Sequence, residues 1–145
     1  MLSWLISDPL PVGSEAPGFS LPDDHGNIVS LHSLRGRNVV LVWYPGDDTS
    51  VCRKQLCEFR DLWPKLNNTL VYGINPQSAE SHAKFRAKFT FPFPLLIDKG
   101  QKVGQLYNTH GIVAKRTVYL IGPDGIIRYA KRGKPDPAEV LAAAV

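Results

Sequence analysis

The sequence predicts an α/β protein, a three-layer α/β/α sandwich with a mixed central sheet and an N-terminal β-hairpin extension. Three observations predict it. Continuous apolar runs at 39–44 and 70–74 are typical of strands buried on both faces of a sheet. Between them, apolar residues recur at steps of three and four from 52 to 66, which indicates an amphipathic helix. Near the end of the chain, two β-rich runs flank Gly122-Pro123-Asp124-Gly125, a pattern that predicts an antiparallel hairpin.

The first half of the chain contributes the extension, one strand and one helix. A small hairpin with strands at 19–21 and 28–31 flanks a polar turn. The strand at 39–44 stops at Pro45-Gly46, and turn-forming residues follow. The helix then begins with Cys52 in its first turn and continues through Leu66 until Asn67-Asn68.

The second half continues the alternation of strands and helices. After the strand at 70–74, a helix is expected near 78–89 and a third strand at 94–97. The hairpin has strands at 116–121 and 126–130. A final helix begins at Asp136-Pro137, since aspartate suits the N-cap and proline the first helical position.

Length and composition limit the classes of protein. A chain of 145 residues that is 43% hydrophobic is the size of one domain, here 1–145. No window reaches the ~18 apolar residues of a membrane span, and no basic region precedes the apolar patch at 2–6, so we expect a cytoplasmic protein without a membrane partner. The formal charge is +4, and eight of the basic residues lie between 99 and 134. No nucleic-acid motif accompanies them, so a solvated face is favoured over nucleic-acid binding.

The two cysteines, Cys52 and Cys57, form a C-x4-C pair, which is neither a C-x-x-C redox motif nor a metal knuckle. The four histidines show no paired spacing, so we expect no metal and no cofactor; they are His25, His32, His82 and His110. At a helix N-terminus, Cys52 faces the positive end of the helix dipole, which favours thiolate over thiol. The alternative is that Cys52 is only the first apolar residue of the buried helix face.

The segment Pro45-Gly46-Asp47-Asp48-Thr49-Ser50-Val51-Cys52 matches the P-x-x-x-T-x-x-C signature of the peroxiredoxins. The chain also resembles this family at 13–21, 31–43, 93–98 and 116–125. Cys57, together with Gln55 where many relatives carry Glu, is similar to the Q subfamily, also called bacterioferritin comigratory proteins.

The resemblance implies a thioredoxin-like fold and a cofactor-free thiol peroxidase acting on hydrogen peroxide and organic hydroperoxides. Cys52 would be the peroxidatic cysteine and Arg116 the active-site cation, while Thr49 and Pro45 would shape the peroxide pocket. Sulfenic acid on Cys52 would condense with Cys57, and thioredoxin or a similar thiol reductant would reopen the disulfide. We expect a monomer or weak homodimer.

Helix geometry adds a constraint that does not depend on the resemblance. Five residues along an intact helix separate two Cα atoms by ~8.6 Å. A disulfide needs them within roughly 7 Å, so the helix must unwind before Cys52 and Cys57 can join.

Other interpretations remain open at this point. Arg116 is alternatively a surface charge, Thr49 only an N-cap, and Cys57 a structural cysteine with an outside thiol as resolving partner. For the whole chain, the alternatives are a non-catalytic thiol redox sensor, a disulfide oxidoreductase and a basic nucleic-acid module.

Overall fold

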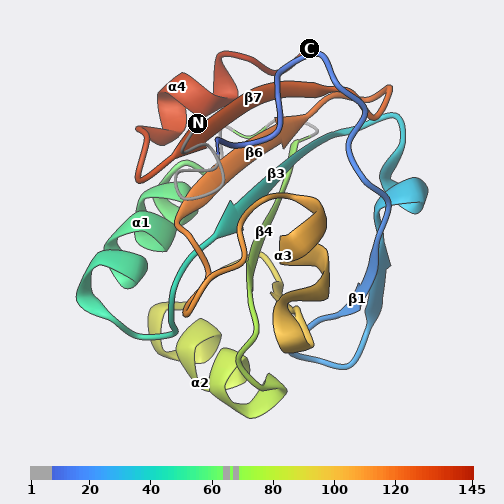
Figure 1. Cartoon of the computed structure of the whole chain (residues 1–145). Helices are drawn as coiled ribbons and strands as arrows, with labels where there is room; N and C mark the ends of the chain where they lie inside the picture. The colour runs from blue at the N-terminus through green and yellow to red at the C-terminus, as the bar shows by residue number, and fades with distance from the viewer. Residues whose placement is uncertain (1–7, 64–65, 67–68) are drawn as a thin grey trace.

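The computed structural model of the chain describes residues 8–63, 66 and 69–145. Its centre is a five-stranded sheet in the order β5-β4-β3-β6-β7 (Figure 1). The strands are β3 (Asn38–Trp43), β4 (Thr69–Asn75), β5 (Leu95–Ile97), β6 (Thr117–Ile121) and β7 (Ile127–Arg132). Strands β3, β4 and β5 are parallel, whereas β6 is antiparallel to both β3 and β7. The mixed sheet and the C-terminal hairpin are therefore as predicted.

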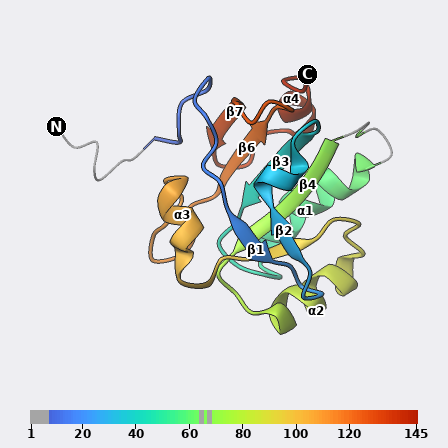
Figure 2. The ribbon, with the colours of Figure 1, turned by 90° about the vertical axis from the view of Figure 1, so that its right-hand side faces the viewer.

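Layers of other elements cover both faces of this sheet (Figures 1 and 2). One face packs against the helices α1 (Ser50–Asp61), α2 (Ala79–Phe89) and α4 (Pro137–Leu141). The other is covered by the antiparallel hairpin of β1 (Ser20–Pro22) and β2 (Ile28–Ser30), by the 3-10 turn η1 (Leu31–Leu34), and by α3 (Lys102–Leu106). The three-layer sandwich and its hairpin extension are confirmed.

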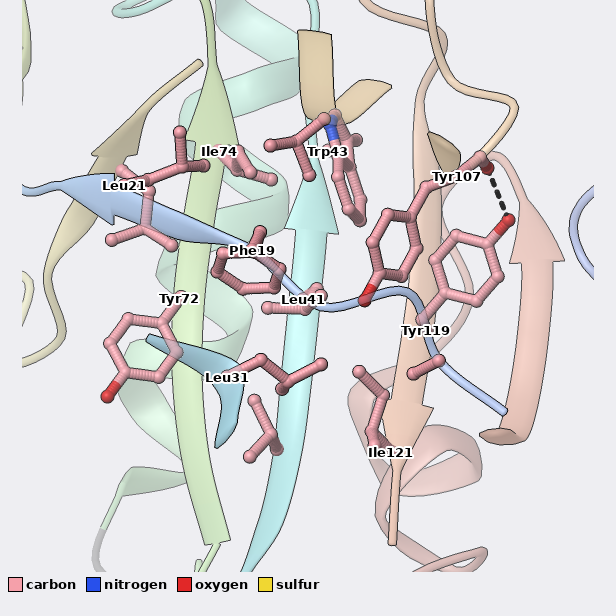
Figure 3. Packing of buried hydrophobic residues seen from close by; sticks show 14 of the residues in the cluster. Phe19, Leu21, Leu31, Leu41, Trp43, Tyr72, Ile74, Tyr107, Tyr119 and Ile121 are labelled. Carbon is pink, nitrogen blue, oxygen red and sulfur yellow. Dashed lines mark hydrogen bonds between the residues drawn. The ribbon is translucent and has the colours of Figure 1, made fainter. Parts of the chain in front are cut away.

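Strand β3 lies at the centre and alternates between the two cores, as period-2 geometry requires. Val39, Leu41 and Trp43 face the hairpin and α3, while Val40 and Val42 face α1. Figure 3 shows the first of these cores, where the Trp43 ring lies 4.9 Å from that of Tyr107. All six residues of β3 are buried, which explains the continuous apolar run in the sequence.

Gly73 of β4 leaves room for the side chains of Leu95 and Tyr44 on the other face. A Cβ atom at this position would lie 2.7 Å from a methyl carbon of Leu95 and 3.1 Å from the ring of Tyr44. Both neighbours are fully buried and have little room to move, so any side chain here would displace them.

Two features of the fold differ from the sequence prediction. Helix α1 ends at Asp61, more than one turn before Leu66, and the expected boundary at Asn67-Asn68 lies outside the described residues. The short elements η3 (Lys99–Gln101) and α3 were not predicted, because α3 is only five residues long. The carboxylate of Asp98 begins α3 by accepting hydrogen bonds from the backbone N–H groups of Val103 and Gly104, at 3.0 and 2.7 Å.

None of the helices in the described ranges has the length and apolar character that crossing a bilayer requires.

Candidate active site

Three of the predicted site residues, Pro45, Thr49 and Cys52, lie where β3 ends and α1 begins. Pro45 follows the strand and has no backbone N–H to extend the ladder. Thr49 has an extended backbone, φ −84° and ψ 150°, and is the N-cap residue of α1. Its hydroxyl makes no capping hydrogen bond and instead donates to the carbonyl of Gly46 at 3.4 Å. The Thr49 hydroxyl is therefore not committed to the helix terminus.

Cys52 lies in the first turn of α1 with its side chain turned toward the sheet. The residue has no exposed surface, and it packs in the same core as Leu56 and Phe59 of that helix. Free N–H groups and the positive end of the helix dipole lie at this terminus and favour negative charge there. Its burial agrees with the interpretation of Cys52 as a core residue. That interpretation does not explain the polar contact that its sulfur makes.

That contact is with Arg116, whose Nη2 donates to the Cys52 sulfur at 3.2 Å. The sheet brings the two residues together, since β3 and β6 are antiparallel neighbours with Trp43 opposite Thr117. Arg116 immediately precedes Thr117 and so lies beside the loop that leads to Cys52. A guanidinium in contact with sulfur stabilises a thiolate and does not lose its own proton.

Gln55, one turn after Cys52 on α1, holds the other side of this guanidinium. Its Oε1 accepts from Nη1 of Arg116 at 2.7 Å, and its Nε2 donates to the carbonyl of Gly133 at 3.4 Å. The side chain is buried, with 1% of the residue exposed. Gln55 thus orients Arg116 without neutralising its charge, a role that the sequence alone did not assign to it.

Cys57 lies on the same helix and is half-buried, and both cysteines are free thiols. Burial raises the pKa of the Cys57 thiol, although the nearby Arg60 works against the shift. In the folded helix Cys57 is therefore held as the thiol, which is a weaker nucleophile than the thiolate.

The sequence did not predict the contact between two polar residues near the site, Asp47 and His82. His82 of α2 is fully buried, and its Nδ1 lies 2.6 Å from Oδ2 of Asp47, in the loop before α1. Burial raises the pKa of Asp47, but side-chain hydrogen bonds, led by that of His82, outweigh it and hold the pKa below its usual value. A signal was present in the sequence, because His82 falls at helical spacing with Phe85 and Phe89 on an otherwise apolar face. The other three histidines are exposed.

A buried cysteine at a helix N-terminus, with an arginine on its sulfur and a mixed sheet behind it, is an arrangement suited to thiol chemistry, and it lies on a thioredoxin-like fold. Residues 12–130 match the model of the AhpC/TSA family. The chain therefore belongs to the AhpC/TSA family, and its relatives are peroxiredoxins.

Individual relatives agree with this assignment. A putative peroxiredoxin bcp of Coxiella burnetii is 40% identical over 81% of this chain and 85% of its own length. Peroxiredoxin Q of Oryza sativa subsp. japonica, a chloroplastic protein, is 38% identical over 86% of this chain; the match spans only 60% of the rice protein.

Solved structures show the same fold. Peroxidoxin BcpB from Mycobacterium tuberculosis superposes with a TM-score of 0.85 at 28% identity, covering 91% of this chain and 94% of that one. PrxQ of Xylella fastidiosa gives the same score and identity, with 93% of its chain covered.

Proposed function

We propose that this protein reduces hydrogen peroxide and organic hydroperoxides, with Cys52 as the peroxidatic cysteine. The observation that carries the proposal is the 3.2 Å contact between Arg116 and the Cys52 sulfur at the N-terminus of α1. It joins a nucleophile, a fixed positive charge and free backbone donors in one buried place, which is what cleavage of an O–O bond needs.

In the first step, the Cys52 thiolate attacks one peroxide oxygen and the O–O bond breaks. The sulfur is oxidised to sulfenic acid, and the second oxygen leaves as hydroxide or alkoxide and takes up a proton to give water or an alcohol. Negative charge moves from sulfur to the leaving oxygen, and the donors proposed for the transition state are Arg116 and the Thr49 hydroxyl. Pro45 shapes the wall of the pocket.

In the second step, the Cys57 thiol attacks the sulfenic acid, forming a disulfide and releasing water. The helix separates the two Cα atoms by ~8.6 Å, so α1 must unwind around them first. Unwinding removes the burial that raises the pKa of Cys57, and so makes its thiolate easier to form.

A dithiol reductant of the thioredoxin type then exchanges with the Cys52–Cys57 disulfide and returns both thiols. We place the cycle in a reducing compartment such as the cytoplasm, because it needs free thiols and a thiol reductant. Each chain supplies both cysteines, so a monomer or a weak homodimer suffices, and residues 1–145 act as one domain.

The test is peroxide consumption with a thioredoxin reducing system, comparing the natural protein with Cys52→Ser and Cys57→Ser. We expect Cys52→Ser to have no activity above background, since serine is a far weaker nucleophile. Cys57→Ser should still react with one equivalent of peroxide but lose turnover with thioredoxin. Substantial activity in Cys52→Ser would contradict the assignment, and one stoichiometric oxidation of the natural protein without turnover would favour a redox sensor.

A further inference from the structure

The loop between β3 and α1 carries a buried carboxylate that the chemistry at Cys52 does not use. Oδ1 of Asp47 accepts hydrogen bonds from the Tyr44 hydroxyl at 2.6 Å and from Nδ2 of Asn75 at 3.2 Å. Oδ2 accepts from the Ser81 hydroxyl and lies beside Nδ1 of His82, both at 2.6 Å. The side chain of Asp47 is 3% exposed and that of His82 is fully buried. Four polar partners therefore hold this buried carboxylate in a fixed position.

The contacts of His82 fit an ion pair with Asp47. Its Nε2 lies 2.8 Å from the carbonyl oxygen of Leu96, which can only accept a hydrogen bond. Its Nδ1 faces Asp47, whose carboxylate already receives hydrogen bonds from two hydroxyls and an amide. Hydrogen on both ring nitrogens would satisfy both contacts, so a pair of imidazolium and carboxylate is the form that fits this geometry. Separating a buried pair of this kind is strongly unfavourable, because each charge is left without a partner.

The pair joins the loop to α2. The backbone N–H of Asp47 also donates to Oε1 of Gln77 at 2.5 Å, just before that helix. The loop is thus held by main chain and side chain together, three residues before α1 begins at Ser50.

The next residue, Asp48, makes different contacts. Its backbone has a φ of 58°, in the left-handed region, and its carboxylate is on the surface. It makes ion pairs with Lys88 of α2 at 2.8 Å and with Arg53 of α1 at 3.8 Å. Exposed ion pairs contribute little to stability, so the contacts of Asp48 hold the loop less firmly than those of Asp47 do.

We propose that Asp47 and His82 are positioning residues that fix the fold of the active-site loop and so set the balance between folded and unwound α1. The proposal rests on the function proposed for Cys52, since that balance matters only if Cys57 must reach it. Unwinding of α1 also releases the loop that precedes it, so the contacts of Asp47 with His82 and Ser81 exist only in the folded form. The pair stabilises the folded form, in which Arg116 contacts the sulfur, and slows access to the disulfide.

The balance decides between two fates of the sulfenic acid. In the folded form, the Cys52 sulfenate attacks a second peroxide, gaining one oxygen to become sulfinate while the peroxide is reduced to water. In the unwound form, Cys57 attacks the sulfenic acid and water leaves. A weaker pair therefore means more disulfide and less sulfinate at a given concentration of peroxide.

The test uses neighbouring, chemically identical substitutions, Asp47→Asn and Asp48→Asn. Amide hydrogen exchange is measured on the reduced protein without peroxide, so it does not depend on the proposed reaction. In Asp47→Asn, exchange across 49–59 should rise by roughly ten- to a hundredfold, the range that loss of hydrogen bonds to a charged group produces. In Asp48→Asn it should stay near that of the natural protein, since asparagine tolerates a left-handed backbone.

Ser81→Ala removes one donor from the same carboxylate and keeps the ion pair, so it should change exchange in the same direction by less. If Asp47→Asn does not fold, Ser81→Ala takes its place in the comparison of hydrogen exchange. Nitrogen NMR should detect two ring N–H groups on His82 in the natural protein and only one in Asp47→Asn.

Equal exchange in the Asp47→Asn and Asp48→Asn variants would overturn the proposal. An increase spread evenly over β3 and β4 would also overturn it, because that pattern means general destabilisation. Hydrogen peroxide in excess should then give a lower ratio of sulfinate to disulfide in Asp47→Asn, measured by mass spectrometry; an unchanged or higher ratio contradicts the role in the balance. If the natural protein shows no peroxidase turnover but the exchange pattern holds, the proposed function fails and the anchoring of the loop stands.

Discussion

Arg116 is the residue on which the chemistry of the site depends most directly. Its guanidinium touches the Cys52 sulfur with one nitrogen and Gln55 with another. Removing the side chain in Arg116→Ala should lower the second-order rate constant for peroxide by about a hundredfold, as loss of one transition-state donor does. Thermal stability should change little. Stopped-flow kinetics and thermal denaturation measure the two effects, and a parallel loss of both would make Arg116 a structural residue.

Gln55 acts through Arg116, so its replacement should leave the thiol in place but displace the charge. Gln55→Met keeps the approximate volume of this buried side chain and removes both of its hydrogen bonds. We expect the rate constant for peroxide to fall about tenfold, the value of one hydrogen bond to a charged group. Gln55→Glu is the matched control: it restores an acceptor for Arg116 but adds a negative charge near sulfur. If Gln55→Met reacts as fast as the natural protein, Arg116 is held by other contacts.

At the scale of single residues, the sequence predicted the types and chain positions of the site residues well, but it did not predict which residues contact one another. The loop signature singled out Pro45, Thr49 and Cys52 because all three lie within eight residues. The contact between Asp47 and His82 spans 35 positions and depends on how α2 lies against the loop. Spacing along the chain places His82 on an apolar helix face but does not identify its partner.

At the scale of elements, α1 has two requirements that conflict. Its helical form brings Cys52 to Arg116, and its unwound form is needed to join Cys52 to Cys57. Oxidation by one equivalent of peroxide should therefore produce the intramolecular disulfide, with loss of helical ellipticity and faster amide exchange across 49–59. Leu56 and Phe59 should lose part of their packing, so the oxidised form should be less stable to denaturant; the small loop closed by the disulfide offsets little of this.

Cys57→Ser is the control for that experiment, because it can form sulfenic acid but no internal disulfide. It should keep its ellipticity after oxidation. Unchanged exchange in the oxidised natural protein, or a disulfide only between two chains, would contradict local unwinding.

The elements themselves were predictable where local signals were strong. Buried strands, the capped helix α4 and the C-terminal hairpin each carry a complete pattern within a few residues. Helix α3 does not, because its first turn depends on the carboxylate of Asp98, which precedes it by four residues. Helix α1 ends early at Asp61 although its apolar spacing continues to Leu66; beyond the helix Trp63 is exposed, whereas Leu66 is buried.

At the scale of the whole molecule, the two cores on the faces of the sheet differ in what they carry. The core toward the hairpin and α3 is built from Trp43, Tyr107 and Tyr119, whose rings lie within 6 Å of one another (Figure 3). The core toward α1 holds Cys52 and borders the pair of Asp47 and His82. The first core can stay packed while part of the second opens, because the sheet lies between them.

The dependence of global stability on pH should report the buried carboxylate of Asp47. Its pKa is held below the usual value in the folded protein, so the unfolded chain takes up this proton first as the pH falls. The resulting stabilisation is fully present above about pH 4, the ordinary range for aspartate, and is lost as the pH falls through the lower folded value. Asp47→Asn lacks this titration, so its free energy of unfolding should fall less steeply between about pH 5 and pH 3. Urea denaturation at a series of pH values measures the two slopes, with Asp48→Asn as the exposed control that should follow the natural protein. Parallel slopes in Asp47→Asn and the natural protein would contradict this prediction. They would mean that the four hydrogen bonds to Asp47 stabilise its ionised carboxylate no more in the folded protein than water does in the unfolded chain.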